Sequence, residues 1–191
     1  MDEKKGLIKK IKSFFKDRIF VKGLIVGVIF ATVFIIFQIG IIEHTSTPEF
    51  CASCHSMEVF HVAWEEGVHG TGKKGIVVAR CVDCHLPHDN LVHYLWAKGV
   101  SGTKDTVATI FGYQPDWIKN LERREEFTYE SGCKKCHVNL VAPGIPIKAF
   151  KAHRQYELGE TNKTCISCHQ DVGHGDLKLK LSNKIVNKEA L

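Results

Sequence analysis

Outside its first 22 residues, this sequence of 191 residues has no excess charge of either sign. The first 22 residues hold eight of the 26 basic and three of the 21 acidic residues, and residues 23–42 hold none, so 18 of each sign remain in residues 43–191. A segment without net positive charge lacks the electrostatic footprint of a nucleic-acid-binding protein. Nucleic acid is therefore excluded as a partner.

Cysteine is absent outside four short motifs, and each motif reads C-x-x-C-H. The motifs are Cys51, Cys54 and His55; Cys81, Cys84 and His85; Cys133, Cys136 and His137; and Cys165, Cys168 and His169. This motif attaches haem c through two thioethers and places the adjacent imidazole beneath the iron. Zinc, iron–sulfur and disulfide sites do not need a histidine directly after each cysteine pair. The motifs therefore predict four covalently attached c-type haems.

Charge is also absent from residues 23–42, a run of twenty residues with Thr32 and Gln38 as its polar members. Twenty helical residues span about 30 Å, the thickness of a bilayer's hydrocarbon core. A cleaved signal peptide would have a shorter apolar region and a small-x-small cleavage site, which Ile42 and Glu43 do not offer. We therefore expect a single uncleaved membrane anchor.

The basic segment 1–22 places the N-terminus in the cytoplasm and the rest of the chain, after Glu43, outside it. Its apolar residues recur at helical spacing among the lysines, which suits a helix lying on the inner leaflet. A charged stop for the anchor, with no further role, explains the same pattern. Both alternatives stay open.

The part of the chain that follows the anchor is too short to bury four haems and a separate side-chain core. Few strand patterns occur, so the sequence predicts a mostly α, haem-packed cytochrome c domain with little regular sheet, on one N-terminal transmembrane helix. We place this domain at residues 43–175 and a polar tail at 176–191. The motif pairs in residues 51–85 and 133–169 suggest two di-haem halves.

The basic N-terminus, the single span, the four motifs and the phrases at residues 50–57 and 81–87 resemble the NapC/NirT/NrfH family of membrane-anchored tetrahaem cytochromes c. The resemblance runs from Gly23 to about Gly175 and is nearest to the small subunits of cytochrome c nitrite reductase. It implies an inner-membrane quinol dehydrogenase that oxidises menaquinol and passes electrons to a periplasmic, multihaem reductase. Cytochrome c nitrite reductase is the first partner it implies; nitrate, hydroxylamine and N- or S-oxide reductases are alternatives.

The resemblance also implies an axial ligand set. On the first haem it implies Met57 in place of the motif histidine, with ordinary ligation by His55 as the alternative. On the other haems it implies the following pairs: His85 with His174 on the second, His137 with either His153 or a side chain of the partner on the third, and His169 with His69 on the fourth.

Lys98 and Asp105 are the candidate quinol site. They are seven residues apart, which places them on one face of a helix, two turns from each other. Tyr94 and Trp96 suit a membrane interface. Quinol oxidation releases protons, and an acid–base pair beside an open haem can accept them. The resemblance implies this role, since the quinol pocket of the family uses a Lys and an Asp at matching places. Without the resemblance, an ordinary solvated pair is the better explanation of these two residues.

Two other functions compete with the quinol dehydrogenase. A terminal reductase acting on nitrite or hydroxylamine is disfavoured, because no motif has the lysine-ligated C-x-x-C-K form. A non-catalytic electron store, wire or haem sensor would not need an acid–base pair beside one open haem. The sequence leaves the quinone, the haem potentials and the oligomeric state open.

Overall fold

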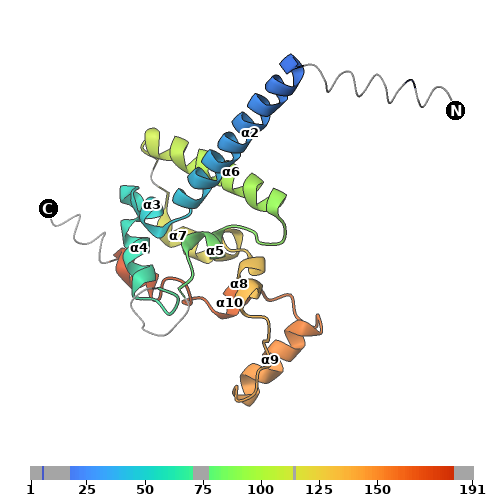
Figure 1. Ribbon diagram of the computed structural model, residues 1–191. Coiled ribbons are helices and arrows are strands. Elements are labelled where there is room, and N and C mark those ends of the chain that lie inside the picture. Colours follow the sequence, from blue (N-terminus) through green and yellow to red (C-terminus); the bar gives the residue numbers. More distant parts are fainter. Residues whose placement is uncertain (1–5, 7–17, 71–77, 114, 183–191) are drawn as a thin grey trace. The chain divides into compact units, whose positions relative to one another are not determined.

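The computed structural model describes residues 6, 18–70, 78–113 and 115–182, and the chain divides into two compact units at Thr45 and Ser46 (Figure 1). Within these ranges the regular structure is helical and no strand occurs, which confirms the predicted mostly α fold. The elements are α2 (Arg18–His44), α3 (Pro48–Ala52), η1 (His55–Met57), α4 (Glu58–Glu65), α5 (Cys81–His85), α6 (Leu91–Ile110), α7 (Trp117–Glu122), η2 (Arg124–Glu126), α8 (Glu130–Cys136), α9 (Ile147–Glu157) and α10 (Cys165–Cys168). Residues 177–182 are also helical.

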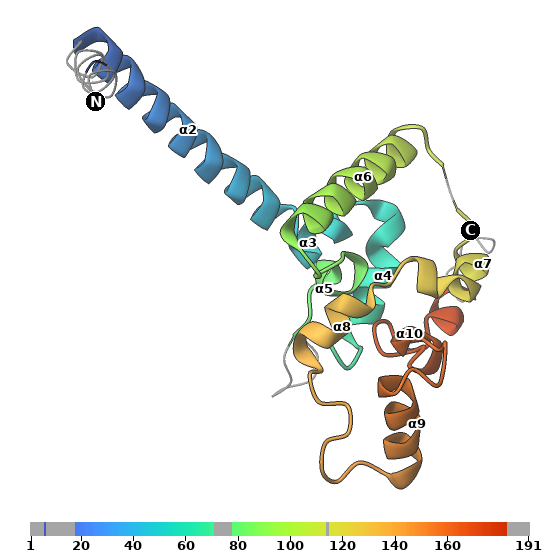
Figure 2. The same ribbon diagram turned by 90° about the vertical axis from the view of Figure 1, so that its right-hand side faces the viewer.

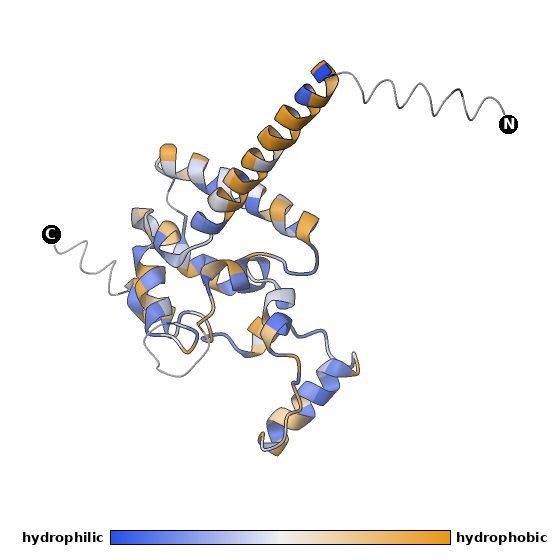
Figure 3. Cartoon of the chain, in the orientation of Figure 1, coloured by the Kyte–Doolittle hydropathy of each residue, from blue (hydrophilic) through white to orange (hydrophobic). Residues whose placement is uncertain are grey.

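The first unit contains α2, a single apolar helix of 27 residues that extends the predicted span by a few residues at each end. Its residues are apolar along most of its length, with hydrophilic residues at its start (Figure 3). The hydroxyl of Thr32 donates to the carbonyl oxygen of Val28 at 2.8 Å, so this polar group is satisfied within the helix. The helix is long and apolar enough to cross a bilayer.

Two predicted segments lie largely or partly beyond the described residues. Of the basic segment 1–22, Gly6 and residues 18–22 are described, and the latter form the first turn of α2. The predicted interfacial helix around residues 7–19 therefore lies almost entirely outside the described residues. Of the tail 176–191, the structure describes residues 176–182.

The second unit has a small side-chain core, divided into two clusters. The first contains Ala63, Leu177 and Leu181 and is flanked by aromatic and aliphatic residues of α4 and α7. The second contains Val82, Leu86 and Ala97. These clusters are small for a unit of this length, which is the property expected of a fold that uses its cofactors as core.

The cysteine motifs lie on short helices joined by irregular chain. Helices of four to seven residues are unstable alone, so caps and neighbours must hold them. Thr47 and Thr164 cap α3 and α10 by accepting hydrogen bonds from the backbone N–H groups of Phe50 and Ser167, each at 3.2 Å. Figure 2 shows α5, α8 and α10 in the part of the chain where these motifs gather.

Gly132 allows α8 to approach α5 closely. A Cβ atom at this position would lie 1.9 Å from the backbone oxygen of Asp83, which no side chain can accept without a shift of one helix. Gly132 is buried and directly precedes Cys133, so its lack of a side chain sets the distance between the second and third motifs. Any larger residue there must push these motifs apart.

We expect Gly132→Ala to lower the melting temperature of the purified holoprotein by about 5 °C, because overpacking costs about 1–3 kcal/mol. Gly99→Ala is the matched control. No atom lies within 4 Å of a Cβ at Gly99, and alanine favours a helix. Equal melting temperatures for the two variants, followed by haem absorbance, would contradict the close approach of α5 and α8.

Candidate functional site

The four cysteine motifs lie side by side in the order of the chain. The thiols of Cys51 and Cys81 lie close enough to act on each other's pKa, so the first and second motifs are neighbours. Helix α5 packs on α8, and α8 packs on α10, which joins the second motif to the third and the third to the fourth. Attachment sites in this order would form a continuous row of haems.

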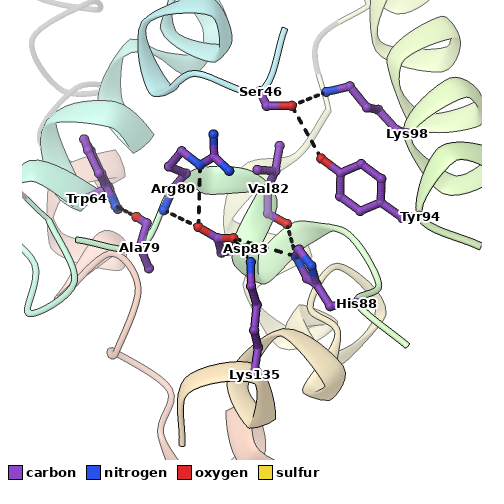
Figure 4. A network of polar contacts seen from close by, with 10 residues as sticks. All are labelled: Ser46, Trp64, Ala79, Arg80, Val82, Asp83, His88, Tyr94, Lys98 and Lys135. Carbon is purple, nitrogen blue, oxygen red and sulfur yellow. Dashed lines mark hydrogen bonds and ion pairs between the residues drawn. The ribbon is translucent and has the colours of Figure 1, made fainter. Parts of the chain in front are cut away.

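Asp83, within the second motif, links α5 to α8 (Figure 4). Its carboxylate accepts hydrogen bonds from the backbone N–H of Arg80 at 2.9 Å and from the ammonium of Lys135 at 3.0 Å. His88 lies 3.8 Å away on the same carboxylate. Burial acts to raise the pKa of Asp83, but the bonds from Lys135 and Arg80 outweigh it and hold the pKa below its ordinary value. The carboxylate is therefore charged at neutral pH.

Glu130 links α8 to α9 and α10 in a similar way. One carboxylate oxygen accepts from the backbone N–H of Cys165 at 2.7 Å, and the other accepts from the hydroxyl of Tyr156 at 2.9 Å. The contact with Tyr156 fixes α9 against the start of the fourth motif. This arrangement determines which histidines can reach the fourth motif.

His85 and His174 face each other with their ring centres 6.1 Å apart. An iron held at about 2 Å by one nitrogen of each ring would separate the ring centres by about 6 Å. Burial lowers the pKa of His174 to about 4, and the charge of His85 adds to the effect. His174 is therefore neutral at pH 7, the form that binds a metal. The structure brings these two predicted partners together.

The other two histidine pairs differ from the predicted ones. The ring of His69 lies 6.0 Å from that of His137, and the ring of His153 lies 6.1 Å from that of His169. In the structure the two motif histidines exchange the expected neighbours: His169 lies beside His153 instead of His69, and His137 lies beside His69 instead of His153. The reason is the position of α9, which the Tyr156–Glu130 contact fixes at the fourth motif instead of the third. The ligand set itself stays a prediction.

Four of these six histidines are oriented by backbone carbonyl groups. Their Nδ1 atoms lie within hydrogen-bonding distance of the carbonyl oxygens of Val172, Phe127, Leu140 and Phe60, as follows: His69 at 3.1 Å, His85 at 2.6 Å, His153 at 2.6 Å and His174 at 3.0 Å. Donation from Nδ1 leaves the lone pair on Nε2 for a metal. The residues therefore fit axial ligation of c-type haem. No local sequence pattern indicates these carbonyl partners, because they lie between 13 and 114 residues away along the chain.

The first motif is less regular. Met57 is half-buried at the end of η1, and the side chain of His55 lies outside the described atoms, so the choice between these two ligands stays a prediction. His61 lies one turn further along α4, and its Nε2 is buried with no hydrogen-bond partner among the described residues. The sequence analysis gave His61 no role. A buried imidazole nitrogen without a partner is suited to bind a group at the first motif.

Lys98 and Asp105 lie on one face of α6, together with the half-buried Tyr94. The ammonium of Lys98 donates to the hydroxyl oxygen of Ser46 at 2.8 Å, and Ser46 lies 3.4 Å from the hydroxyl of Tyr94 (Figure 4). The charges of Lys98 and Asp105 both act on the pKa of Cys51, in opposite directions. This face of α6 is therefore close to the first cysteine motif.

Loss of solvent raises the pKa of Asp105 above its ordinary value, although the positive charges of Lys104 and His85 oppose this effect. A carboxylate with a raised pKa is a better proton acceptor than an ordinary surface aspartate. The arrangement offers a hydrogen-bond donor and a proton acceptor about two helical turns apart, beside one haem-attachment site.

The comparisons with known proteins agree with one another and indicate one family of cytochromes c. Residues 15–179 match the NapC/NirT cytochrome c family, N-terminal region. The chain is 30% identical over 162 residues to the denitrification system component NirT of Stutzerimonas stutzeri, covering 79% of each chain. It is 32% identical over 167 residues to the tetraheme c-type cytochrome CymA of Shewanella oneidensis, covering 79% of this chain and 88% of CymA.

A further relative is longer than this chain. The cytochrome c-type protein TorY of Haemophilus influenzae is 34% identical over 149 residues, which is 70% of this chain but 38% of TorY. Among solved structures, the crystal structure of the cytochrome c nitrite reductase NrfHA complex bound to the HQNO inhibitor contains a similar chain. The TM-score is 0.52 at 26% identity, and the match covers 83% of this chain and 91% of that one.

The angle between paired rings gives a test of the exchanged partners. The planes of His69 and His137 are 85° apart, whereas those of His153 and His169 are 37° apart. Perpendicular imidazoles on a low-spin ferric haem give a strongly anisotropic EPR signal, and nearly parallel ones give a rhombic signal. We expect His69→Ala to remove an anisotropic signal and His153→Ala to remove a rhombic one.

Haem content, measured as the pyridine haemochrome, controls for loss of the cofactor in either variant. If His153→Ala removed the anisotropic signal instead, the pairing of His153 with His169 would be wrong.

Proposed function

The chain belongs to the NapC/NirT cytochrome c family, and we propose that it oxidises a quinol at α6 and passes the electrons through four haems to a periplasmic reductase. Membership of the family makes the chain a membrane-anchored, electron-transferring cytochrome c. The number of haems, the quinol site and the partner are the parts that we propose. The observation that carries the quinol site is the proximity of Lys98 and Asp105 to the first motif.

Each haem would be held by the two cysteines of one motif and by axial ligands from the chain. The eight cysteines supply the thioethers, and the ring pairs His85 with His174, His69 with His137 and His153 with His169 supply ligands for three irons. Met57 or His55 would serve the first. When bound, the haems supply one-electron carriers. The row of motifs supports transfer in chain order, from the first to the fourth.

The residues of α6 would handle the protons of the quinol. Oxidation of a quinol to a quinone gives up two electrons, one at a time to haem, and two protons. Asp105, whose pKa is raised by loss of solvent, would accept each proton in turn from the quinol hydroxyls and release it to water. Lys98, held in place by Ser46, would donate a hydrogen bond to the oxygen that loses its proton. Because haems carry electrons and not protons, the protons would be released on the side of the membrane where α6 lies.

We place that side outside the cytoplasm. The basic residues of segment 1–22 favour a cytoplasmic N-terminus, so the residues that follow α2 would be periplasmic. Covalent attachment of haem c takes place outside the cytoplasm, which agrees with this orientation.

Cytochrome c nitrite reductase is the partner that we favour, because the similar solved chain belongs to the NrfHA complex of that enzyme. Another periplasmic reductase is the second candidate. The similarity to NirT, a component of a denitrification system, and to TorY supports this alternative. In both cases the chain would donate electrons and would not itself reduce the terminal substrate.

We expect Asp105→Asn and Lys98→Leu to slow haem reduction by a menaquinol analogue by about 100-fold, the usual contribution of a positioned acid or base. Reduction is followed by haem absorbance in the purified full-length protein. Dithionite, which needs no proton acceptor on α6, should reduce every variant at the same rate. HQNO should block the reaction with quinol and leave that with dithionite unchanged.

Lys104→Arg is the matched control. Lys104 lies on α6 next to Asp105 but on another face of the helix, and arginine keeps the positive charge that acts on the pKa of Asp105. This variant should be reduced by quinol at the rate of the unchanged protein. Equal rates for Asp105→Asn and Lys104→Arg would remove Asp105 from the quinol site.

The choice of partner has its own test. The chain, menaquinol and purified cytochrome c nitrite reductase should together consume nitrite, and omission of the chain should stop consumption. If the chain is reduced by quinol but the mixture consumes no nitrite, the reductase is a different one.

A further inference from the structure

We propose that the outer face of α6 lies in the membrane–water interface and contacts phospholipid, so that the chain meets the bilayer at α6 as well as through α2. This contact extends the proposed function but does not depend on quinol oxidation. It follows from which residues the two faces of α6 carry.

The inner face of α6 is defined by the residues that contact the rest of the second unit. Ala97 is buried in a core cluster, Tyr94 packs against that cluster, and Lys98 binds Ser46. Asp105 lies two turns beyond Lys98 on the same face. The opposite face therefore points away from the unit.

That outer face carries Val92, Trp96, Gly99, Thr103 and Ile110, which are spaced three, four or seven residues apart. Three of these residues are large, apolar and strongly exposed: Val92 by 78%, Trp96 by 72% and Ile110 by 73%. Figure 3 shows apolar residues toward both ends of α6.

The ionisable residues of α6 lie on other faces than this stripe; they are His93, Lys98, Lys104 and Asp105. A helix on the surface of a soluble domain normally presents charged residues outward and apolar residues inward. Single exposed apolar side chains are common, but three large ones on one face without a charged residue mark an interaction surface.

The contacts of α6 with Ser46, which closely follows the end of the membrane helix α2, indicate that this outer face contacts lipid. Ser46 follows the last residue of α2, His44, by two residues, which reach at most about 7 Å. Helix α2 has 27 residues, about 40 Å of helix against a hydrocarbon core of about 30 Å, so its end lies among the lipid headgroups. The contacts of Ser46 with Lys98 and Tyr94 therefore keep α6 near the headgroup layer.

This layer is where amphipathic helices bind membranes, with the apolar face toward the acyl chains. Tryptophan, such as Trp96, is enriched there. Lipid contact on the outer face would place Lys98 and Asp105 about one helix diameter from the bilayer, roughly 10–12 Å. A quinol could then reach the inner face with little exposure to water.

A nitroxide label on α6 tests this contact in the intact holoprotein. We expect labels at Val92→Cys and Ile110→Cys, in vesicles of phosphatidylcholine and phosphatidylglycerol, to be several-fold more accessible to oxygen, which concentrates in lipid, than to a water-soluble nickel chelate. Lys151→Cys, on the exposed face of α9, is the control and should show the opposite preference.

Two results would overturn the proposal. Greater access of the nickel chelate at residues 92 and 110 would place this face of α6 in water. Low access of both reagents would bury it against a protein, whether a second copy or a partner. Neither result depends on quinol oxidation, so failure here leaves the test of Asp105 unaffected.

Discussion

Three pairs of histidine rings, each with centres about 6 Å apart, are the constraint on which the rest of this structure depends. This separation suits one iron between two imidazoles. The carbonyl groups of Val172, Phe127, Leu140 and Phe60 fix four of the rings by accepting from Nδ1. The second unit thus positions its ligands with backbone groups, which need no core of their own.

Two partly buried carboxylates then hold the short helices in register. Asp83 ties α5 to α8 through Lys135, and Glu130 ties α8 to α9 and α10 through Tyr156 and the backbone of Cys165. Gly132 allows the closest approach between two motifs. Since few side chains are fully buried, these contacts and the haem attachments would carry most of the stability of the unit.

The attachment chemistry and the anchor can be predicted from the sequence alone, because both depend on local patterns. C-x-x-C-H needs no tertiary information, and neither does a run of twenty uncharged residues. Local patterns could not predict which motif histidine lies beside His69 and which lies beside His153. This arrangement depends on where α9 packs, which the contact between Tyr156 and Glu130 decides over a long stretch of chain. The proximity of Lys98 to the first motif likewise depends on Ser46, a residue with no signal of its own.

The proposed electron transfer requires that one chain binds four haems through its four motifs. Intact-protein mass spectrometry of the denatured, full-length protein tests this number most directly, because thioether bonds survive denaturation. We expect the mass of the chain plus four haems. A homogeneous mass with three haems or fewer would contradict this number, since at least one motif would then serve another purpose.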